Sequence, residues 1–272
     1  MIELEFTKME AAGNDFIIVD DTRGSNFSAV GDISRLARYL CTRKRSVGSD
    51  GLLLIEPSEK ADVKMRIFNP DGSEVSMCGN GSRAAAYYAC HRKIAQGKMT
   101  IETRAGVLRA SVLDDAAKIQ MTDPGAITEK KIDLASGKTK LFFVNTGVPH
   151  AVFMAEDIDG VDVAGIGREV RYHSAFSPEG TNADFIQVKN RNTIFLRTYE
   201  RGVEEETLAC GTGAVAGAIV SSEMGLTCSP VKVKTRGGDA LYIYFNKDNR
   251  VYNDVFLEGE VRLVYEGRVV YV

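Results

Sequence analysis

The chain has 272 residues, of which 44% are hydrophobic and 26% charged, and its formal net charge is -3. This length allows one large domain or two of ordinary size, and so mild an acidic balance gives no reason to expect nucleic acid or an anionic membrane as a partner. No run approaches the roughly 18 apolar residues of a spanning helix, and the first ten residues, MIELEFTKME, lack an apolar signal core. The sequence therefore predicts a cytoplasmic protein.

Cysteine and histidine usage gives no basis for a metal site or a disulfide framework. The five cysteines, at positions 41, 78, 90, 210 and 228, form no CxxC pair, and their number is odd. None of the three histidines, at 91, 150 and 173, stands at a short ligand spacing from a cysteine. We expect thiols in a reducing compartment and no bound metal.

The first half of the chain alternates short apolar runs with turn residues. Helical spacing of apolar residues predicts a helix from about residue 32 to 43, and SRAAAYYACHRKIA predicts a second helix that stops at Gly97. Asp50, Asp71 and Glu74 are interpreted as turn or capping groups. The predicted strands are IELEFTKM, FIIVD, GLLLIE, VKMRIFN, MTIET, VLRASVL and AKIQM.

The second half repeats this order after the turn at 123–125. A helix is predicted near residues 162 to 171, and another in GAVAGAIVSSEMG after Cys210. The predicted strands are LFFVNTG, AVFMAED, ADFIQV, IFLRTYE, VKVKT, ALYIYF, DVFLEGE and EGRVVYV.

Three pairs of landmarks recur at nearly one offset. Gly13 and Gly147 are 134 residues apart, Asp50 and Asp184 are 134 apart, and Cys78 and Cys210 are 132 apart. Matching order at matching spacing indicates an internal duplication. We predict an α/β (α+β) fold of two pseudo-symmetric domains, residues 1–122 and 123–262, with a C-terminal strand at 263–272 completing the first.

Each half carries one helix of small residues, which follows a cysteine and a Gly-x-Gly turn. AAAYYA follows Cys78, and AVAGA follows Cys210. Small residues on nearly every face suit a helix enclosed by sheet, so each domain is predicted to be a mostly antiparallel or mixed sheet, a barrel wrapped around a central helix. A thiol at a helix N-terminus meets unpaired N–H groups, so we expect a lowered thiol pKa and a carboxylate site beside it.

Two such cysteines facing one carbon from opposite sides would invert a stereocentre. One thiolate removes a proton from one face and the other thiol returns one to the opposite face, while convergent amides stabilise the developing negative charge. This chemistry needs no cofactor, and Cys78 and Cys210 are the predicted acid/base pair.

The sequence closely resembles the diaminopimelate epimerases, cofactor-independent isomerases that interconvert LL- and meso-2,6-diaminopimelate for lysine and peptidoglycan synthesis. Segments that carry the resemblance include KMEAAGNDFIIVD, FNPDGSEVSMCGNGSRAA, NTGVPHAVF, EGTNADFIQV and YERGVEEETLACGTGAVA. It implies an active site in a cleft between the two domains, a small-molecule substrate and a homodimer with Tyr265 at its contact.

The resemblance also implies roles for individual residues. His150 and Glu200 resemble groups that tune the pKa values of the cysteines, and Arg201 resembles a fork for the distal carboxylate. The implied substrate-binding residues are Asn14, Asn69, Gly79, Asn80, Asn182, Glu200, Arg201, Gly211 and Thr212. Two positions depart from the family pattern: Val148 replaces an asparagine before Pro-His, and Gly51 replaces a glutamine that some members carry.

Three other functions remain open on the sequence. Proline racemases and hydroxyproline epimerases are related two-cysteine enzymes, but they tend to have histidine where Asn80 stands here and lack a segment like YERG. A dinucleotide site is weakly suggested by Gly79, Gly81 and Ala84 with Glu102 further on, but no clear parallel βαβ unit surrounds them. A thiol redox switch through Cys78 and Cys210 is the third.

Overall fold

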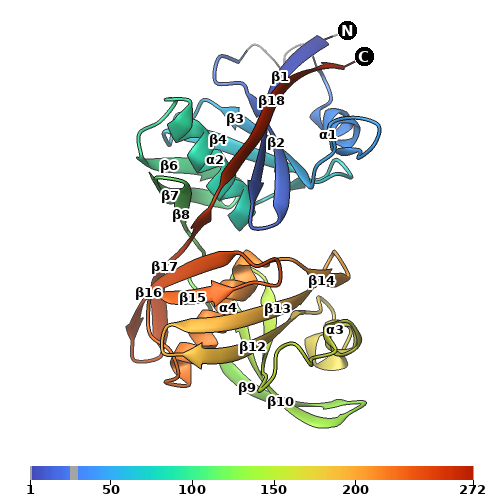
Figure 1. Cartoon of the computed structure of the whole chain (residues 1–272), viewed down its shortest axis with the longest axis vertical. Coiled ribbons are helices and arrows are strands. Elements are labelled where there is room, and N and C mark those ends of the chain that lie inside the picture. The colour runs from blue at the N-terminus through green and yellow to red at the C-terminus, as the bar shows by residue number, and fades with distance from the viewer. Residues whose placement is uncertain (1, 25–29, 272) are drawn as a thin grey trace. The chain divides into compact units, whose positions relative to one another are not determined.

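The computed structural model describes residues 2–24 and 30–271. The chain divides into two compact units, residues 1–120 with 258–272, and residues 121–257 (Figure 1). None of the helices in the described part is long and apolar enough to cross a membrane. Each unit is described below by itself.

The described residues of unit 1 form nine strands and two helices. The helices are α1 (Ile33–Cys41) and α2 (Gly79–His91). The strands are β1 (Ile2–Ala11), β2 (Asn14–Asp20), β3 (Gly51–Glu56), β4 (Val63–Phe68), β5 (Glu74–Val75), β6 (Lys98–Thr103), β7 (Gly106–Leu113), β8 (Ala116–Gln120) and β18 (Arg262–Tyr271).

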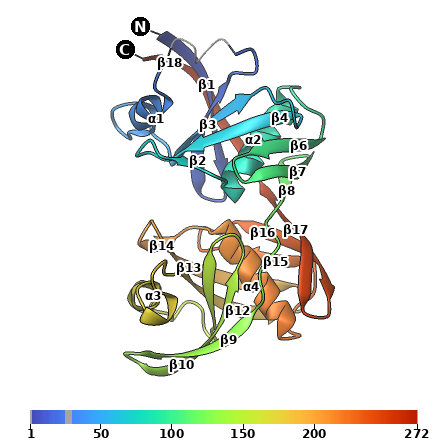
Figure 2. The same ribbon diagram turned by 180° about the vertical axis from the view of Figure 1, so that it is seen from behind.

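Unit 2 repeats this order with α3 (Val163–Arg171) as the outer helix and α4 (Gly211–Glu223) as the inner one (Figure 2). A short 3-10 turn, Ser174–Phe176, follows α3. The strands are β9 (Thr128–Leu134), β10 (Gly137–Asn145), β11 (Pro149–Met154), β12 (Asn182–Asn190), β13 (Thr193–Glu200), β14 (Glu205–Thr207), β15 (Val231–Lys234), β16 (Ala240–Asp248) and β17 (Val251–Glu260), which extends past residue 257.

The strand pairings show that the two units share one topology. In unit 1, β2 and β3 are parallel, β3 and β4 antiparallel, and β4 and β6 parallel. In unit 2, β11 and β12 are parallel, β12 and β13 antiparallel, and β13 and β15 parallel. The predicted α/β fold class, with duplicated halves and one central helix in each, is confirmed.

The pairing of the first long strand in each unit reveals a difference in connectivity. In unit 2, β10 pairs with β9, which directly precedes it in the chain. In unit 1, β1 has the equivalent antiparallel partner in β18, the last strand of the chain, with Ile2 opposite Tyr271. The N- and C-terminal ends of the described chain therefore belong to one unit, and β18 occupies in unit 1 the place that β9 occupies in unit 2.

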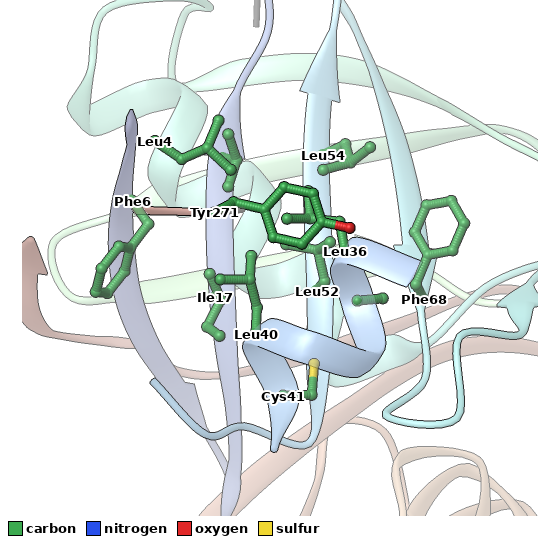
Figure 3. Close-up of a cluster of buried hydrophobic side chains, with 12 residues drawn as sticks. Leu4, Phe6, Ile17, Leu36, Leu40, Cys41, Leu52, Leu54, Phe68 and Tyr271 are labelled. Atoms are coloured by element: carbon green, nitrogen blue, oxygen red, sulfur yellow. The ribbon is translucent and has the colours of Figure 1, made fainter. Parts of the chain in front are cut away.

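The strand β3 is buried on both faces, which explains its run of apolar residues. Leu52 and Leu54 pack with Leu36 and Leu40 of α1 in a core that also includes Phe6, Phe68 and Tyr271 (Figure 3). Leu53 points the other way, toward Gly81 of α2, where its Cδ2 would lie 3.3 Å from an added Cβ. Alternate residues of one strand thus serve two helices, and each buried leucine contributes about 1.5 to 3 kcal/mol.

Unit 2 is layered in the same way. Phe153, Phe185 and Tyr199 pack in the core beside α3, where Gly167 allows the helix to approach Tyr199 closely. On the α4 side, Gly217 lies against Ile186 and Ile194. Both inner helices are buried along nearly their whole length, as their small residues predict.

Two local predictions are wrong. The helix after Cys78 ends at His91, not at Gly97, because Lys93 adopts a left-handed conformation with φ 59° and the N–H groups of Ile94 and Ala95 bond back to Ala89. Glu74 is not a turn or capping group. It lies in β5 and holds Arg66 in a two-point ion pair at 2.8 and 3.0 Å.

Candidate active site

The two predicted catalytic cysteines occupy the same structural position in their units. Cys78 is the N-cap of α2 and Cys210 the N-cap of α4, and both have extended backbone, with φ, ψ of -141°, 124° and -124°, 113°. The Cys78 carbonyl accepts from Ser82 N–H at 2.8 Å, and the Cys210 carbonyl accepts from Ala214 N–H at 2.9 Å. The geometry of the duplicated turn is therefore preserved.

Each helix begins with the glycine after its cysteine. The N–H groups of Gly79 and Asn80 in α2, and of Gly211 and Thr212 in α4, lie in the first turn, where a helix has no acceptor of its own for its N–H groups. These four residues are the ones that the family resemblance marks as a backbone cradle. Together with the positive end of the helix dipole, such a turn can bind a carboxylate.

Around the start of α2, polar side chains form one continuous chain of hydrogen bonds. Asn80 Nδ2 donates to Asn14 Oδ1 at 2.7 Å, and Asn14 Nδ2 donates to Asp50 Oδ2 at 3.3 Å. At the other end, Arg83 Nη2 donates to Asn80 Oδ1 at 2.7 Å, and the Arg83 side chain is fully buried. Asn14 and Asn80, two of the predicted substrate-binding residues of this unit, are thus held by each other and by the charged side chains of Asp50 and Arg83.

The outer end of this chain is an ion-pair cluster. Asp15 accepts from Lys8 at 2.8 Å and from Arg43 at 2.6 Å, and Arg43 also reaches Asp50 at 2.8 Å. Burial alone would raise the pKa of Asp15, but the hydrogen bonds from Arg43 and Lys8 bring that pKa well below its usual range. The loop that carries Asn14 is fixed by these charges.

Asn69, the other predicted binding residue of unit 1, lies in the turn after β4. Its Nδ2 donates to Ser73 Oγ at 3.1 Å, and its backbone N–H and carbonyl close the turn on Ser73 and Gly72.

At Gly51, an added Cβ would lie 3.2 Å from the Phe68 carbonyl and 3.3 Å from the Phe16 ring. Glycine at this departure from the family pattern is therefore matched to the tight packing of Phe16.

The start of α4 has an acidic environment. Glu200, at the end of β13, and Asp184, in β12, lie near Cys210, whose thiol is buried. Burial, then the charges of Glu200 and Asp184, raise the pKa of Cys210 well above its usual value, against the smaller effects of Thr212 and of the Gly213 N–H. The predicted lowering of the thiol pKa is wrong for Cys210, because burial and two carboxylates outweigh the helix N-terminus.

The other predicted residues of unit 2 contact one another. The His150 ring lies 2.6 Å from Asp184 through Nδ1 and 3.5 Å from Asn182 Nδ2 through Nε2. Asn182 Oδ1 accepts from the Arg201 N–H at 2.7 Å, and Arg201 Nη1 donates to the Glu179 carbonyl at 3.2 Å. Burial, the largest effect, and the charge of Asp184 raise the pKa of Glu200 above its usual value, while the charge of His150 acts in the opposite direction.

The structure adds two residues to the predicted set, Arg83 and Asp184. The sequence predicts Asp184 only as a landmark at matched spacing with Asp50, and it predicts no role for Arg83, which stands beside the alanines of its helix. A charged residue in a segment that must be buried is the signal that identifies both.

Val148 lies in the turn before β11, where its carbonyl accepts from Thr146 N–H. Among the residues described, no cluster of histidine, cysteine and acidic side chains could hold a metal ion.

Comparison with protein families gives two matches to one model. The family model described as diaminopimelate epimerase matches residues 6–127 and again 142–264. A diaminopimelate epimerase of Aquifex aeolicus is 44% identical over 275 residues, covering 98% of both chains. One from Hydrogenobaculum is 41% identical, covering 97% of this chain and 98% of its own, and one from Archaeoglobus fulgidus is 38% identical, covering 98% and 96%.

Solved structures share the fold at lower identity. A phenazine biosynthesis protein of the PhzF family from Bacillus anthracis superposes with a TM-score of 0.74 at 18% identity, over 100% of both chains. A probable proline racemase from Agrobacterium radiobacter gives 0.69 at 15% identity, covering 98% of this chain and 93% of its own. These structures have the same duplicated architecture, and at such identity the likeness extends to the fold alone.

Proposed function

The chain belongs to the diaminopimelate epimerase family, and we propose that it interconverts LL- and meso-2,6-diaminopimelate by moving a proton between the two faces of one α-carbon. The observation that carries this proposal is the duplicated turn. Cys78 and Cys210 are each the N-cap of an enclosed helix, with matching backbone angles and matching carbonyl hydrogen bonds. Two equivalent thiols suit a reaction whose forward and reverse directions are nearly mirror images.

In the proposed mechanism the two cysteines act on opposite faces of one carbon of the substrate. One cysteine, as thiolate, removes the α-proton while the other, as thiol, delivers a proton to the opposite face. The first-turn amides of Gly79, Asn80, Gly211 and Thr212 stabilise the negative charge that spreads into the carboxylate. No cofactor or metal takes part.

The remaining predicted residues orient the substrate or adjust the thiols. Asn14, Asn69 and Asn182 offer hydrogen bonds, Arg201 binds the distal carboxylate and Glu200 the distal ammonium. His150 and Glu200 adjust the protonation of Cys210, an assignment supported by the charge of Glu200 beside that thiol. The product would supply lysine or peptidoglycan synthesis. The proposed cytoplasmic location is in keeping with an odd number of cysteines and no CxxC pair, which suit thiols in a reducing compartment.

Proton exchange with solvent tests the reaction directly. Incubated with LL-diaminopimelate in heavy water, the protein is expected to give meso product that carries deuterium at the inverted carbon, because a thiol exchanges its proton with water between turnovers. Mass spectrometry and chiral chromatography measure both. Proline and hydroxyproline are tested beside it, and inversion of either of them in place of diaminopimelate would contradict the proposed substrate.

We also propose that the protein forms a homodimer through β18. This strand exposes a row of apolar side chains: Leu263, Val264, Tyr265 and Val270, at 37%, 55%, 43% and 50% exposure. Tyr265 is held in place by edge-to-face contact with Phe6, at 5.8 Å between ring centroids. Such a row on a strand at the surface is a typical protein contact.

Light scattering after size exclusion tests the dimer. Tyr265→Glu is expected to convert a dimer to a monomer, because it would bury a charge at the contact. Leu113→Glu is the matched control, since Leu113 is 76% exposed on β7, which pairs with β6 and β8, and that variant should stay dimeric. A monomeric wild-type protein, or a dimer that both variants retain, would contradict the assignment of β18.

A further inference from the structure

Asp184 is a buried carboxylate with three fixed neighbours. It lies two residues after Asn182 in β12, on the same face of the strand, and His150 pairs in register with Asn182 from the parallel strand β11. His150 Nδ1 is 2.6 Å from Asp184 Oδ2, and both side chains are fully buried. The contact joins two neighbouring strands directly behind the predicted substrate-binding amide.

The second carboxylate oxygen is equally constrained. Thr198 lies opposite Asp184 in β13, and its hydroxyl donates to Asp184 Oδ1 at 2.8 Å. The same oxygen lies against Gly213 in the first turn of α4, so close that an added Cβ would be 2.5 Å away. Both carboxylate oxygens are therefore in contact with a partner at the start of α4, Oδ1 with the Thr198 hydroxyl and Oδ2 with the His150 ring.

These contacts decide which ring nitrogen of His150 carries a hydrogen. An ionised carboxylate only accepts hydrogen bonds, so the Nδ1 that faces it is N–H. The other nitrogen, Nε2, is 3.5 Å from Asn182 Nδ2. Asn182 Oδ1 is already used by the Arg201 N–H at 2.7 Å, which fixes the amide so that its NH₂ group faces the ring. An amide N–H only donates, so Nε2 is an acceptor.

We propose that Asp184 is a positioning residue that keeps the hydrogen of His150 on Nδ1, so that the ring presents Nε2, without a hydrogen, toward Asn182. Two independent contacts, a carboxylate on one side and an amide donor on the other, favour the same form of the ring. The effect on turnover rests on the proposed epimerase activity, whereas the form of the ring does not.

The groups around the ring make this arrangement consequential. Asp184 and Asn182 from β12 contact the ring directly. The other titratable groups at this end of the unit are Glu200 from β13 and Cys210 from α4. The charges of Glu200 and Asp184 act on Cys210, and that of His150 acts on Glu200. A ring with its hydrogen held on Nδ1 presents one defined acceptor, Nε2, on the side away from Asp184, and a mixture of ring forms would not.

The simpler interpretation is that the contact between Asp184 and His150 only ties β11 to β12. Those strands already pair through their backbones from His150 to Met154. If the contact served only to join the two strands, either ring nitrogen could carry the hydrogen. The form of the ring therefore distinguishes the two interpretations.

Nitrogen-15 NMR of histidine-labelled protein measures this form directly in the absence of substrate. The chain has three histidines, and His150→Gln identifies the His150 signals by their loss. The neutral ring of wild-type His150 is expected to show a hydrogen on Nδ1 and none on Nε2. A wild-type ring that keeps Nε2–H overturns the proposal, whatever the reaction is.

Two variants connect the ring form with turnover. Asp184→Leu removes the acceptor, so the ring is expected to populate Nε2–H and kcat to fall about 100-fold or more, as for other histidines that lose an orienting carboxylate. Asp184→Asn keeps an oxygen toward Nδ1 while the Thr198 hydroxyl turns to accept from the amide, so it should retain Nδ1–H and recover part of kcat.

Thr198→Val is the matched control. It removes the donor on the other carboxylate oxygen, leaves Asp184 charged, and should retain Nδ1–H with a smaller loss of kcat. Asp184→Leu with an unchanged ring form and full kcat would overturn the proposal. If that variant does not fold, the ring form in the wild type and in Asp184→Asn still decides it. Inactive wild-type protein with Nδ1–H would refute the epimerase function and leave the ring assignment intact.

Discussion

Alanine in place of Cys78 or of Cys210 is expected to reduce inversion of diaminopimelate about 10²- to 10⁴-fold, because each change removes either the acid or the base from one face of the carbon. Each single variant keeps one thiol, and that thiol can still remove and return a proton on its own face. Cys78→Ala and Cys210→Ala should therefore exchange deuterium without inversion into opposite stereoisomers. Stereochemical analysis of the recovered substrate in heavy water measures both effects.

Cys228→Ala is the control for this pair. Cys228 is an exposed thiol that follows the end of α4, whereas Cys210 lies at its start, and its loss should leave inversion unchanged. Two variants that exchange into the same stereoisomer would show that the thiols do not act on opposite faces. Full inversion in either variant would remove that cysteine from the mechanism.

Leucine in place of Ala85 or Ala216 is expected to lower the free energy of unfolding by about 3 kcal/mol in each case. Both alanines are fully buried on the enclosed helices, Ala85 on α2 and Ala216 on α4. Three added carbons must displace surrounding strands, and such overpacking costs about 1 to 3 kcal/mol or more. Because both helices are enclosed, the two losses should be similar, and urea unfolding of each variant measures them.

Ala164→Leu supplies the same substitution on an outer helix. Ala164 is exposed on α3, so its replacement should change the unfolding free energy by no more than about 0.5 kcal/mol. If Ala85→Leu or Ala216→Leu unfolded at the same urea concentration as this control, the inner helices could not be as tightly enclosed as their burial indicates.

Features that repeat locally could be predicted from the sequence. The central helices were predictable because alanine and glycine follow each cysteine, and α1 because Leu36 and Leu40 recur at helical spacing. The duplication followed from constant offsets between landmarks. Three short or polar strands, β5, β9 and β14, were not predicted, because a sequence such as TEKKIDL in β9 gives only two buried positions, Ile132 and Leu134.

Features that depend on distant neighbours could not be predicted. The raised pKa of Cys210 requires Glu200 and Asp184 to converge on the start of α4, and helix position alone predicts the opposite direction. The end of α2 depends on Lys93 adopting a conformation that glycine usually adopts. The sequence thus identified the two cysteine turns at the starts of the inner helices, whereas the charge around one of them is a property of the folded unit.

The pairing of β1 with β18 has a consequence for synthesis on the ribosome. Chains are made from the N-terminus, so β1 leaves the ribosome before unit 2, and β18, its partner strand, leaves after it. Unit 2, residues 121–257, holds all of its strands on one uninterrupted stretch and is complete while the final residues are still being added. The sheet of unit 1 is thus begun first and completed last. Until β18 has been made, one edge of β1 has no partner strand.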